Sequence, residues 1–99
     1  MVRDRLKVNG TIYKVKHRKR VFYDGELVMG ICLSGGRQEI RVTTAGPFEQ
    51  FDTEWHEALH AIVYEYRIVL THDQLTKLAG ALVQVLIESP WLGQPRGQE

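Results

Sequence analysis

Apolar and polar residues alternate through much of the first half of the chain, which is the pattern of β-strands. Between residues 11 and 17, charged side chains alternate with mostly apolar ones, so one face suits solvent and the other suits a core. Asn9-Gly10 and Asp24-Gly25 are turn signals, because both positions of a type I′ hairpin turn need φ > 0. These features predict a β-rich region over residues 1–45.

Two further strands are expected within this region. The run from Glu26 to Leu33 is rich in apolar residues, with Gly30 interpreted as a bulge, and Glu39 to Thr43 alternates again. Ser34-Gly35-Gly36 turns the chain between them, and Ala45-Gly46-Pro47 breaks the pattern. Together with the first hairpin, these segments predict an antiparallel sheet of roughly three to five strands.

The apolar residues of the second half recur with the period of an α-helix. Asp52 or Thr53 can cap a first helix that runs to about Tyr66. One stripe of this helix is predicted to face a core. The stripe consists of Trp55, Leu59, Ile62, Val63 and Tyr66.

A second helix follows after a short link. Thr71 and Gln74 have the spacing of a capping box, which predicts that the helix begins there. Its apolar stripe continues to about Ile87, and Pro90 ends it. The predicted fold class is therefore α+β: an N-terminal antiparallel sheet followed by two packed helices over residues 52–88.

Length and composition agree with one small domain. The chain has 99 residues, of which 43% are hydrophobic and 25% are charged, as in ordinary globular proteins. We expect the domain to span residues 1–92. Residues 93–99 are rich in Gly, Pro and Gln and are expected to form a flexible tail.

Composition also bears on compartment and partners. Uninterrupted apolar runs are too short to span a membrane, and the N-terminus lacks the apolar region of a secretory signal. Cys32 is the single cysteine, so no intramolecular disulfide can form, and we interpret it as a small buried side chain. We therefore expect a cytoplasmic protein without a membrane partner.

The net charge of +1 conceals an uneven distribution. Residues 1–23 contain eight basic residues and one acidic residue, whereas residues 54–99 contain three basic and six acidic residues. The basic half suits an anionic partner, so a nucleic-acid-binding module is one candidate function. His17-Arg18-Lys19-Arg20 is its most basic stretch. We interpret it as a solvated loop, because no aromatic residues are interleaved with it.

The strongest functional signal is His56-Glu57-Ala58-Leu59-His60, an H-E-x-x-H motif in the first predicted helix. Residues four apart on a helix project in nearly the same direction, so His56 and His60 can bind one metal ion. Both lie at the border of the apolar stripe. Glu57 is expected just beyond them, toward solvent, where a general base for a metal-bound water belongs.

A hydrolytic zinc site needs a third protein ligand and one open position for water. Helical geometry favours His72, which faces the first helix, over Asp73, which points to solvent and remains the alternative. Glu65 lies on the far side of the first helix from the two histidines, and Glu88 lies at the far end of the second. His72 can reach the motif only if the helices cross at a tilt or the first helix is short.

The segment from Thr53 to Tyr66, followed by Leu70-Thr71-His72 and a helix ending near Leu86, resembles a minimal zincin. It is similar to the small metallopeptidase-like proteins of bacteriophages and prophages, over roughly residues 26–88. The resemblance implies that His56 and His60 are ligands, that Glu57 is the base, and that His72, opening the next helix, is the third ligand. It also implies a host cytoplasm as the location. The chain lacks the glycine and third histidine of metzincins and a well-placed gluzincin glutamate.

The expected function is that of a zinc-dependent hydrolase, specifically a small metallopeptidase. Glu57 takes a proton from the zinc-bound water as it attacks a peptide carbonyl. By resemblance, an edge strand beside the active helix aligns a peptide substrate, and Gly35-Gly36 to Thr43 is the expected strand. The rival interpretations are a non-catalytic zincin-like module that binds metal and a protein partner, and the basic nucleic-acid-binding module.

Overall fold

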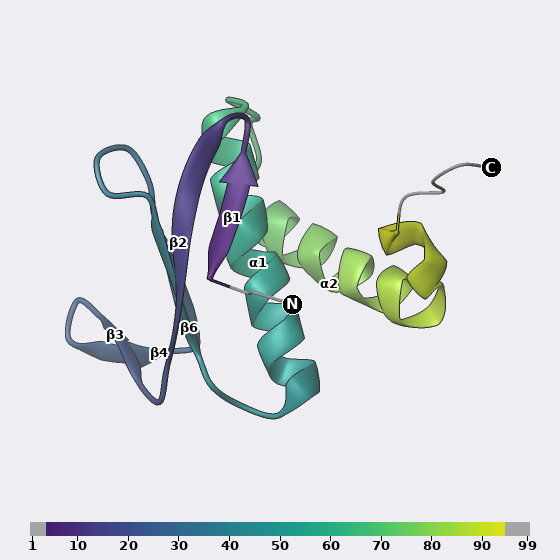
Figure 1. Ribbon diagram of the computed structural model, residues 1–99, viewed down its shortest axis with the longest axis horizontal. Coiled ribbons are helices and arrows are strands. Elements are labelled where there is room, and N and C mark those ends of the chain that lie inside the picture. Colours follow the sequence, from purple (N-terminus) through teal and green to yellow (C-terminus); the bar gives the residue numbers. More distant parts are fainter. Residues whose placement is uncertain (1–3, 95–99) are drawn as a thin grey trace.

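The structure, a computed structural model, describes residues 4–94 and has the α+β architecture that the sequence predicts (Figure 1). Within these residues, six strands precede two α-helices and a short 3-10 helix. The elements are β1 (Arg5–Val8), β2 (Thr11–Arg18), β3 (Val21–Tyr23), β4 (Glu26–Val28), β5 (Gly30–Leu33), β6 (Glu39–Thr43), α1 (Pro47–Glu65), α2 (His72–Glu88) and η1 (Pro90–Gly93). None of the helices in this range has the length and apolar character needed to cross a membrane.

The strands form a four-stranded sheet with the order β1-β2-β6-β5 and a separate hairpin of β3 and β4. The pair β2 and β6 is parallel, so the sheet is mixed and the prediction of a purely antiparallel sheet is wrong for this pair. Strand β6 runs antiparallel to β5 and inserts between β5 and β2. Alternation of residue types identifies the faces of a strand but not its neighbours. The main sheet has four strands, within the predicted three to five, and the run from Glu26 to Leu33 divides at Met29 into β4 and β5.

Both predicted hairpin turns are confirmed. Asn9 and Gly10 join β1 to β2 with φ of 49° and 83°, and Asp24 and Gly25 join β3 to β4 with φ of 53° and 82°. Glycine adopts such angles without strain, and Asn and Asp adopt them more readily than other residues. The turn residues therefore fix the register of two antiparallel strand pairs.

Helix α1 begins earlier than predicted. Its N-cap is Gly46, and Pro47 occupies the first turn, where the fixed φ of proline favours a helix and its missing N–H costs nothing. Thr53 lies inside the helix, and its Oγ1 donates to the Glu49 carbonyl oxygen at 2.9 Å. The prediction of a cap at Asp52 or Thr53 is therefore wrong, and Pro47 starts the helix instead of interrupting the chain.

Helix α2 begins as predicted. The Thr71 hydroxyl accepts a hydrogen bond from the Gln74 N–H at 3.1 Å, and the Gln74 side chain accepts one from the Thr71 N–H at 2.9 Å. The helix ends at Glu88, and Pro90 opens η1. Gly93 closes η1, so the predicted tail does not include it, and residues 95–99 of that tail lie outside the described residues.

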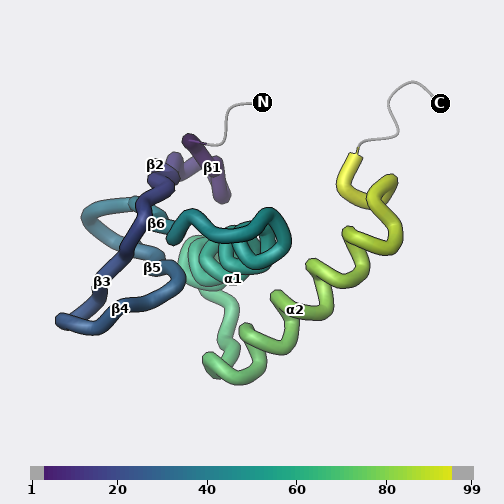
Figure 2. The backbone as a smooth tube through the Cα atoms, turned by 90° about the horizontal axis from the view of Figure 1, so that it is seen from below, coloured from purple at the N-terminus to yellow at the C-terminus, as the bar shows by residue number. Residues whose placement is uncertain are grey.

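Helix α1 lies between the sheet and α2 and therefore has two packed faces (Figure 2). The cluster on the sheet side contains Val8, Tyr13, Ile40, Val42 and Ala61. The cluster on the α2 side contains Leu59, Leu75 and Ala79. The prediction of a single core-facing stripe is therefore wrong in part: Tyr66 is 54% exposed, whereas Ala61, outside the stripe, is fully buried.

Candidate metal centre

Three histidine side chains come together where α1 and α2 approach each other. His56 and His60 lie one turn apart on α1, and His72 is the first residue of α2. Their ligand nitrogens all lie within 4.8 Å of one another. The ring centroids are separated by 4.9 Å, 5.4 Å and 5.5 Å. Helix α2 crosses α1 obliquely (Figure 1), which is the tilt that a contribution from His72 requires.

The rings of His56 and His60 lie close enough to share one ion. Their Nε2 atoms are 3.2 Å apart, and two nitrogens held at about 2.0–2.1 Å by one tetrahedral zinc ion are separated by about 3.3 Å. Burial lowers the pKa of both imidazoles, and the neighbouring histidines add to this effect. Both rings therefore favour the neutral form that metal ligation requires. The donor set fits a three-histidine zinc site.

The other candidate ligands are engaged elsewhere. Asp73 is exposed, and its carboxylate pairs with Lys77 Nζ at 3.2 Å, one turn along α2. Glu65 accepts hydrogen bonds from residues of β2, and Glu88 accepts one from Gln84. Among the residues that the structure describes, His72 is the one that joins His56 and His60 in a group of potential ligands.

Glu57 lies against the sheet, so its predicted orientation toward solvent is wrong. The residue is 6% exposed, because this side of α1 packs on β5. Burial raises the pKa of its carboxyl from 4.5 to about 7. Within residues 4–94 the carboxylate forms no hydrogen bond or ion pair. Packing alone therefore holds this carboxyl group in a place where its protonated and ionised forms both exist near neutral pH.

Gly30, the first residue of β5, makes this position of Glu57 sterically feasible. A Cβ atom at residue 30 would lie 2.8 Å from Thr53 Cγ2, 3.0 Å from the Arg41 carbonyl oxygen and 3.1 Å from Glu57 Cγ. The sequence interpretation treated Gly30 as a bulge and missed its role in the site. A glycine inside a strand pattern also signals close approach of another segment, and that signal is the correct one here.

A polar cluster fixes the C-terminal end of α1 on the sheet. The Tyr13 hydroxyl donates to Glu65 Oε2 at 2.7 Å and lies 2.9 Å from Ser34 Oγ. Thr11 Oγ1 donates to Glu65 Oε1 at 3.1 Å. Burial is the main cause that raises the pKa of Tyr13 to about 12, so this side chain stays a donor. The sequence interpretation missed this cluster, because its members are far apart in the chain.

Cys32 lies on β5 and packs against the sheet-side cluster. It is partly buried and unpaired, which agrees with its interpretation as a small packing residue. Burial raises the pKa of its thiol to about 11, and the Ser34 hydroxyl lies 3.7 Å from its Sγ. A thiol with so high a pKa is a poor nucleophile and a poor metal ligand at neutral pH.

The strand expected to align a substrate is in the wrong place. Strand β6, which forms most of the segment from Gly35 to Thr43, is hydrogen-bonded to β2 on one side and to β5 on the other. The edges of the sheet are β1 and β5, and β5 packs more extensively against α1. The chain turns at Gly35, and β6 then lies between β2 and β5. Strand β5 is therefore left at the edge of the sheet.

Comparisons with protein-family models, with curated proteins and with solved structures found no match. The resemblance to zincins therefore rests on the H-E-x-x-H motif, on His72 and on the order of the elements.

Proposed function

We propose that this chain is a zinc-dependent hydrolase of the small metallopeptidase type. The observation that carries the proposal is the group formed by His56, His60 and His72, whose ligand nitrogens lie within 4.8 Å of one another. Three histidines with one further open position are a ligand set of catalytic zinc sites, whereas structural zinc sites use four protein ligands. Glu57 adjoins His56 in the chain and is buried without a partner among the described residues, which suits a general base.

Three histidines and one glutamate have separate roles in this proposal. His56, His60 and His72 would hold Zn²⁺ through neutral imidazole nitrogens. When bound, a zinc ion supplies Lewis acidity that acidifies water and polarises a carbonyl. The Glu57 carboxylate accepts a proton from the attacking water and delivers it to the amine that leaves when the peptide C–N bond breaks. Its pKa of about 7 suits both halves of this transfer near neutral pH.

We place the substrate along β5. This strand is an edge of the sheet that packs against α1, and its outer side has no strand partner among the described residues. An extended peptide can add to such an edge through backbone hydrogen bonds. Gly30 is the first residue of this strand and lies beside the Glu57 side chain. A peptide paired with β5 would therefore run past the proposed base.

Replacement of Glu57 by Gln tests the mechanism. The variant keeps the shape of the side chain and removes its basicity, so turnover of a random peptide library should fall by about 10²–10⁴-fold. Its zinc content should remain that of the unmodified chain. Glu88→Gln is the matched control, because Glu88 is exposed at the far end of α2 and should not affect turnover. Turnover that survives in Glu57→Gln contradicts the proposed role.

A non-catalytic metal-binding module is the second candidate, and the position of an apolar hollow favours it. That hollow, of about 600 Å³, is lined by β1 and by the face of α1 that carries Trp55, not by the histidines. A module of this kind binds zinc and shows no hydrolysis with any peptide of the library. The comparison of unmodified chain with Glu57→Gln therefore distinguishes it, because both would then be equally inactive.

A basic nucleic-acid-binding module is the third candidate, supported by the strand register. Paired residues share a face of a sheet, and the pairs Arg5–Lys14 and Lys16–Arg41 place four cations on one face. Glu39 neutralises part of this charge, because its carboxylate forms ion pairs with Lys16 and Arg41. His17 and Arg18 belong to β2, which corrects the prediction that residues 17–20 form a loop. Absence of a gel shift with DNA and RNA at low salt excludes this candidate.

A further inference from the structure

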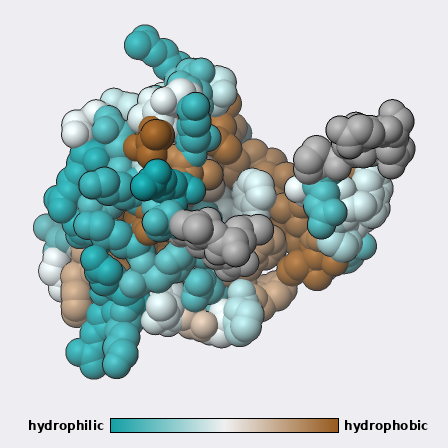
Figure 3. All heavy atoms as spheres, viewed as in Figure 1, coloured by the Kyte–Doolittle hydropathy of each residue, from teal (hydrophilic) through white to brown (hydrophobic). Residues whose placement is uncertain are grey.

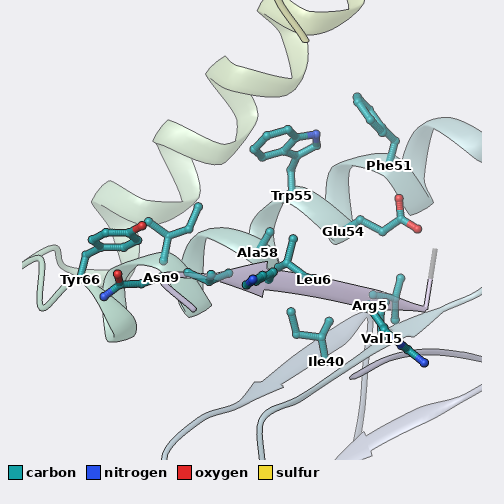
Figure 4. A pocket seen from close by; sticks show the side chains of 14 residues that line it. Arg5, Leu6, Asn9, Val15, Ile40, Phe51, Glu54, Trp55, Ala58 and Tyr66 are labelled. Carbon is teal, nitrogen blue, oxygen red and sulfur yellow. The ribbon is translucent and has the colours of Figure 1, made fainter. Parts of the chain in front are cut away.

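An open apolar groove follows the face of α1 that points away from the histidines. It has a volume of about 600 Å³ and lies between β1 and α1 (Figure 4). Its apolar walls include Leu6, Ile40, Phe51, Trp55 and Ala58. On the helical wheel of α1, Trp55 lies about 100° from His56, so the groove and the histidine group are separate features.

The apolar surface continues from this groove onto α2. Leu75, Ala79 and Val83 are buried against α1. Ile87, in the last turn of α2, is 43% exposed and lines a hollow together with Phe51. Phe51 also lines the groove, so the apolar surface of the groove reaches the C-terminal half of α2.

The pictures agree with this placement. The C-terminal half of α2 runs away from α1 toward the side of the molecule on which β1 lies (Figure 2). Apolar residues form a band that extends from beside β1, across α1, to α2 (Figure 3). Trp91 and Leu92 of η1, at the end of α2, are 64% and 51% exposed. Contiguous exposed apolar residues on a small domain are typical of an interaction site.

The two borders of this band carry opposite charges. Arg5 and Lys7 line the groove from β1 and are exposed, whereas Glu54 lines it from α1. At the other border, the last turn of α2 contains no basic residue and ends with the exposed Glu88. The C-terminal end of a helix adds a partial negative charge of its own. One border is therefore basic and the other acidic.

We propose that a second copy of this chain covers the band. In a two-fold dimer, the C-terminal half of α2 from each copy lies in the groove of the other. The symmetry brings the basic border of one copy to the acidic border of the other, so that Arg5 and Lys7 face Glu88 of the second copy. A single chain supplies both the apolar groove and the apolar helix flank. Complementary charge at the borders therefore favours a second copy over an unrelated partner.

Sedimentation equilibrium of the untagged chain tests the dimer. The expected mass is twice 11.4 kDa. Ile87→Lys places a charge in each of two equivalent contacts, so the dissociation constant should rise about a hundredfold or more. Phe22→Lys is the matched control, because Phe22 is 57% exposed on β3, outside the band, and the mass should stay that of a dimer. The mass of one chain at all concentrations up to about 100 µM, or growth to open-ended assemblies, overturns the proposal.

A charge exchange provides a second test that does not disturb the apolar contacts. Lys7→Glu and Glu88→Lys should each weaken the dimer, and the two changes in one chain should restore it. A double variant that is weaker than either single variant overturns the arrangement. His56→Ala leaves the band intact, so the dimer should persist in it. Failure of the dimer and failure of the metal site can thus be told apart.

Discussion

Replacement of Gly30 by Ala should destabilise the protein and disturb the proposed base together. The added methyl group would lie 2.8 Å from Thr53 Cγ2 and 3.1 Å from Glu57 Cγ, so both side chains must move. It would also lie 3.0 Å from the Arg41 carbonyl oxygen, which belongs to the backbone of β6, the strand that pairs with β5. A backbone neighbour inside a sheet cannot yield as a flexible side chain can.

The size of the effect follows from these contacts. Insertion of a methyl group into a packed region costs about 1–3 kcal/mol. Ala has less conformational freedom than Gly in the unfolded chain, which raises the free energy of unfolding by about 0.4–1 kcal/mol. The middle of each range gives a net loss of about 1.3 kcal/mol, which lowers the midpoint of thermal unfolding by about 5–10 °C in a domain of this size. Turnover should fall as well, because α1 moves relative to β5 and carries Glu57 with it.

Thermal and urea unfolding, followed by circular dichroism, measure this loss. Gly36→Ala is the control for the change of residue type, because a Cβ there meets nothing within 4 Å, and its stability should change by less than about 0.5 kcal/mol. Gly80→Ala also meets nothing within 4 Å. Because Gly80 lies inside α2, this variant should gain about 1 kcal/mol. A Gly30→Ala protein as stable and as active as Gly36→Ala would refute the packing of Glu57 against β5.

Two further predictions concern ionisable side chains. Glu57 has a folded-state pKa of about 7 against an ordinary value of 4.5. Between these two pKa values the metal-free folded protein keeps a proton on Glu57 that the unfolded chain has lost. The free energy of unfolding should therefore fall by about 3 kcal/mol as the pH rises from about 4.5 to about 8. The lowered pKa values of His56 and His60 act in the opposite direction. The contribution of Glu57 is therefore measured as the difference in unfolding free energy between the unmodified chain and Glu57→Gln. A difference that does not change with pH contradicts the prediction. Tyr13→Phe removes the donor to the Glu65 carboxylate and should cost about 1.5–3 kcal/mol in urea unfolding, whereas Tyr23→Phe, at a 59% exposed position, should cost nothing measurable.

Local signals in the sequence predict their structures well. The Asn9-Gly10 turn and the Thr71 cap depend on residues that are neighbours in the chain, so their chemistry can be recognised without the fold. The spacing of His56 and His60 likewise follows from the helix alone. Placement of His72 beside them needed one further condition, a tilted crossing, and the helices satisfy it.

Features that depend on contacts between distant segments could not be predicted in the same way. The orientation of Glu57 was wrong because a wheel built on one apolar stripe assumes one packed face, whereas α1 packs on both the sheet and α2. The parallel pairing of β2 with β6 leaves no local trace, and it converts the expected substrate strand into an interior one. The bond between Tyr13 and Glu65 joins positions 52 residues apart.

The metal content of the untagged protein, measured by mass spectrometry beside His72→Ala and Asp73→Ala, tests whether the three histidines hold a zinc ion. We expect about one zinc ion per chain in the unmodified protein and in Asp73→Ala. We expect His72→Ala to lose that zinc, because the remaining pair of histidines would bind too weakly to retain it. A protein that takes up no zinc after supplementation, or a His72→Ala variant that keeps its full zinc content, contradicts the three-histidine site.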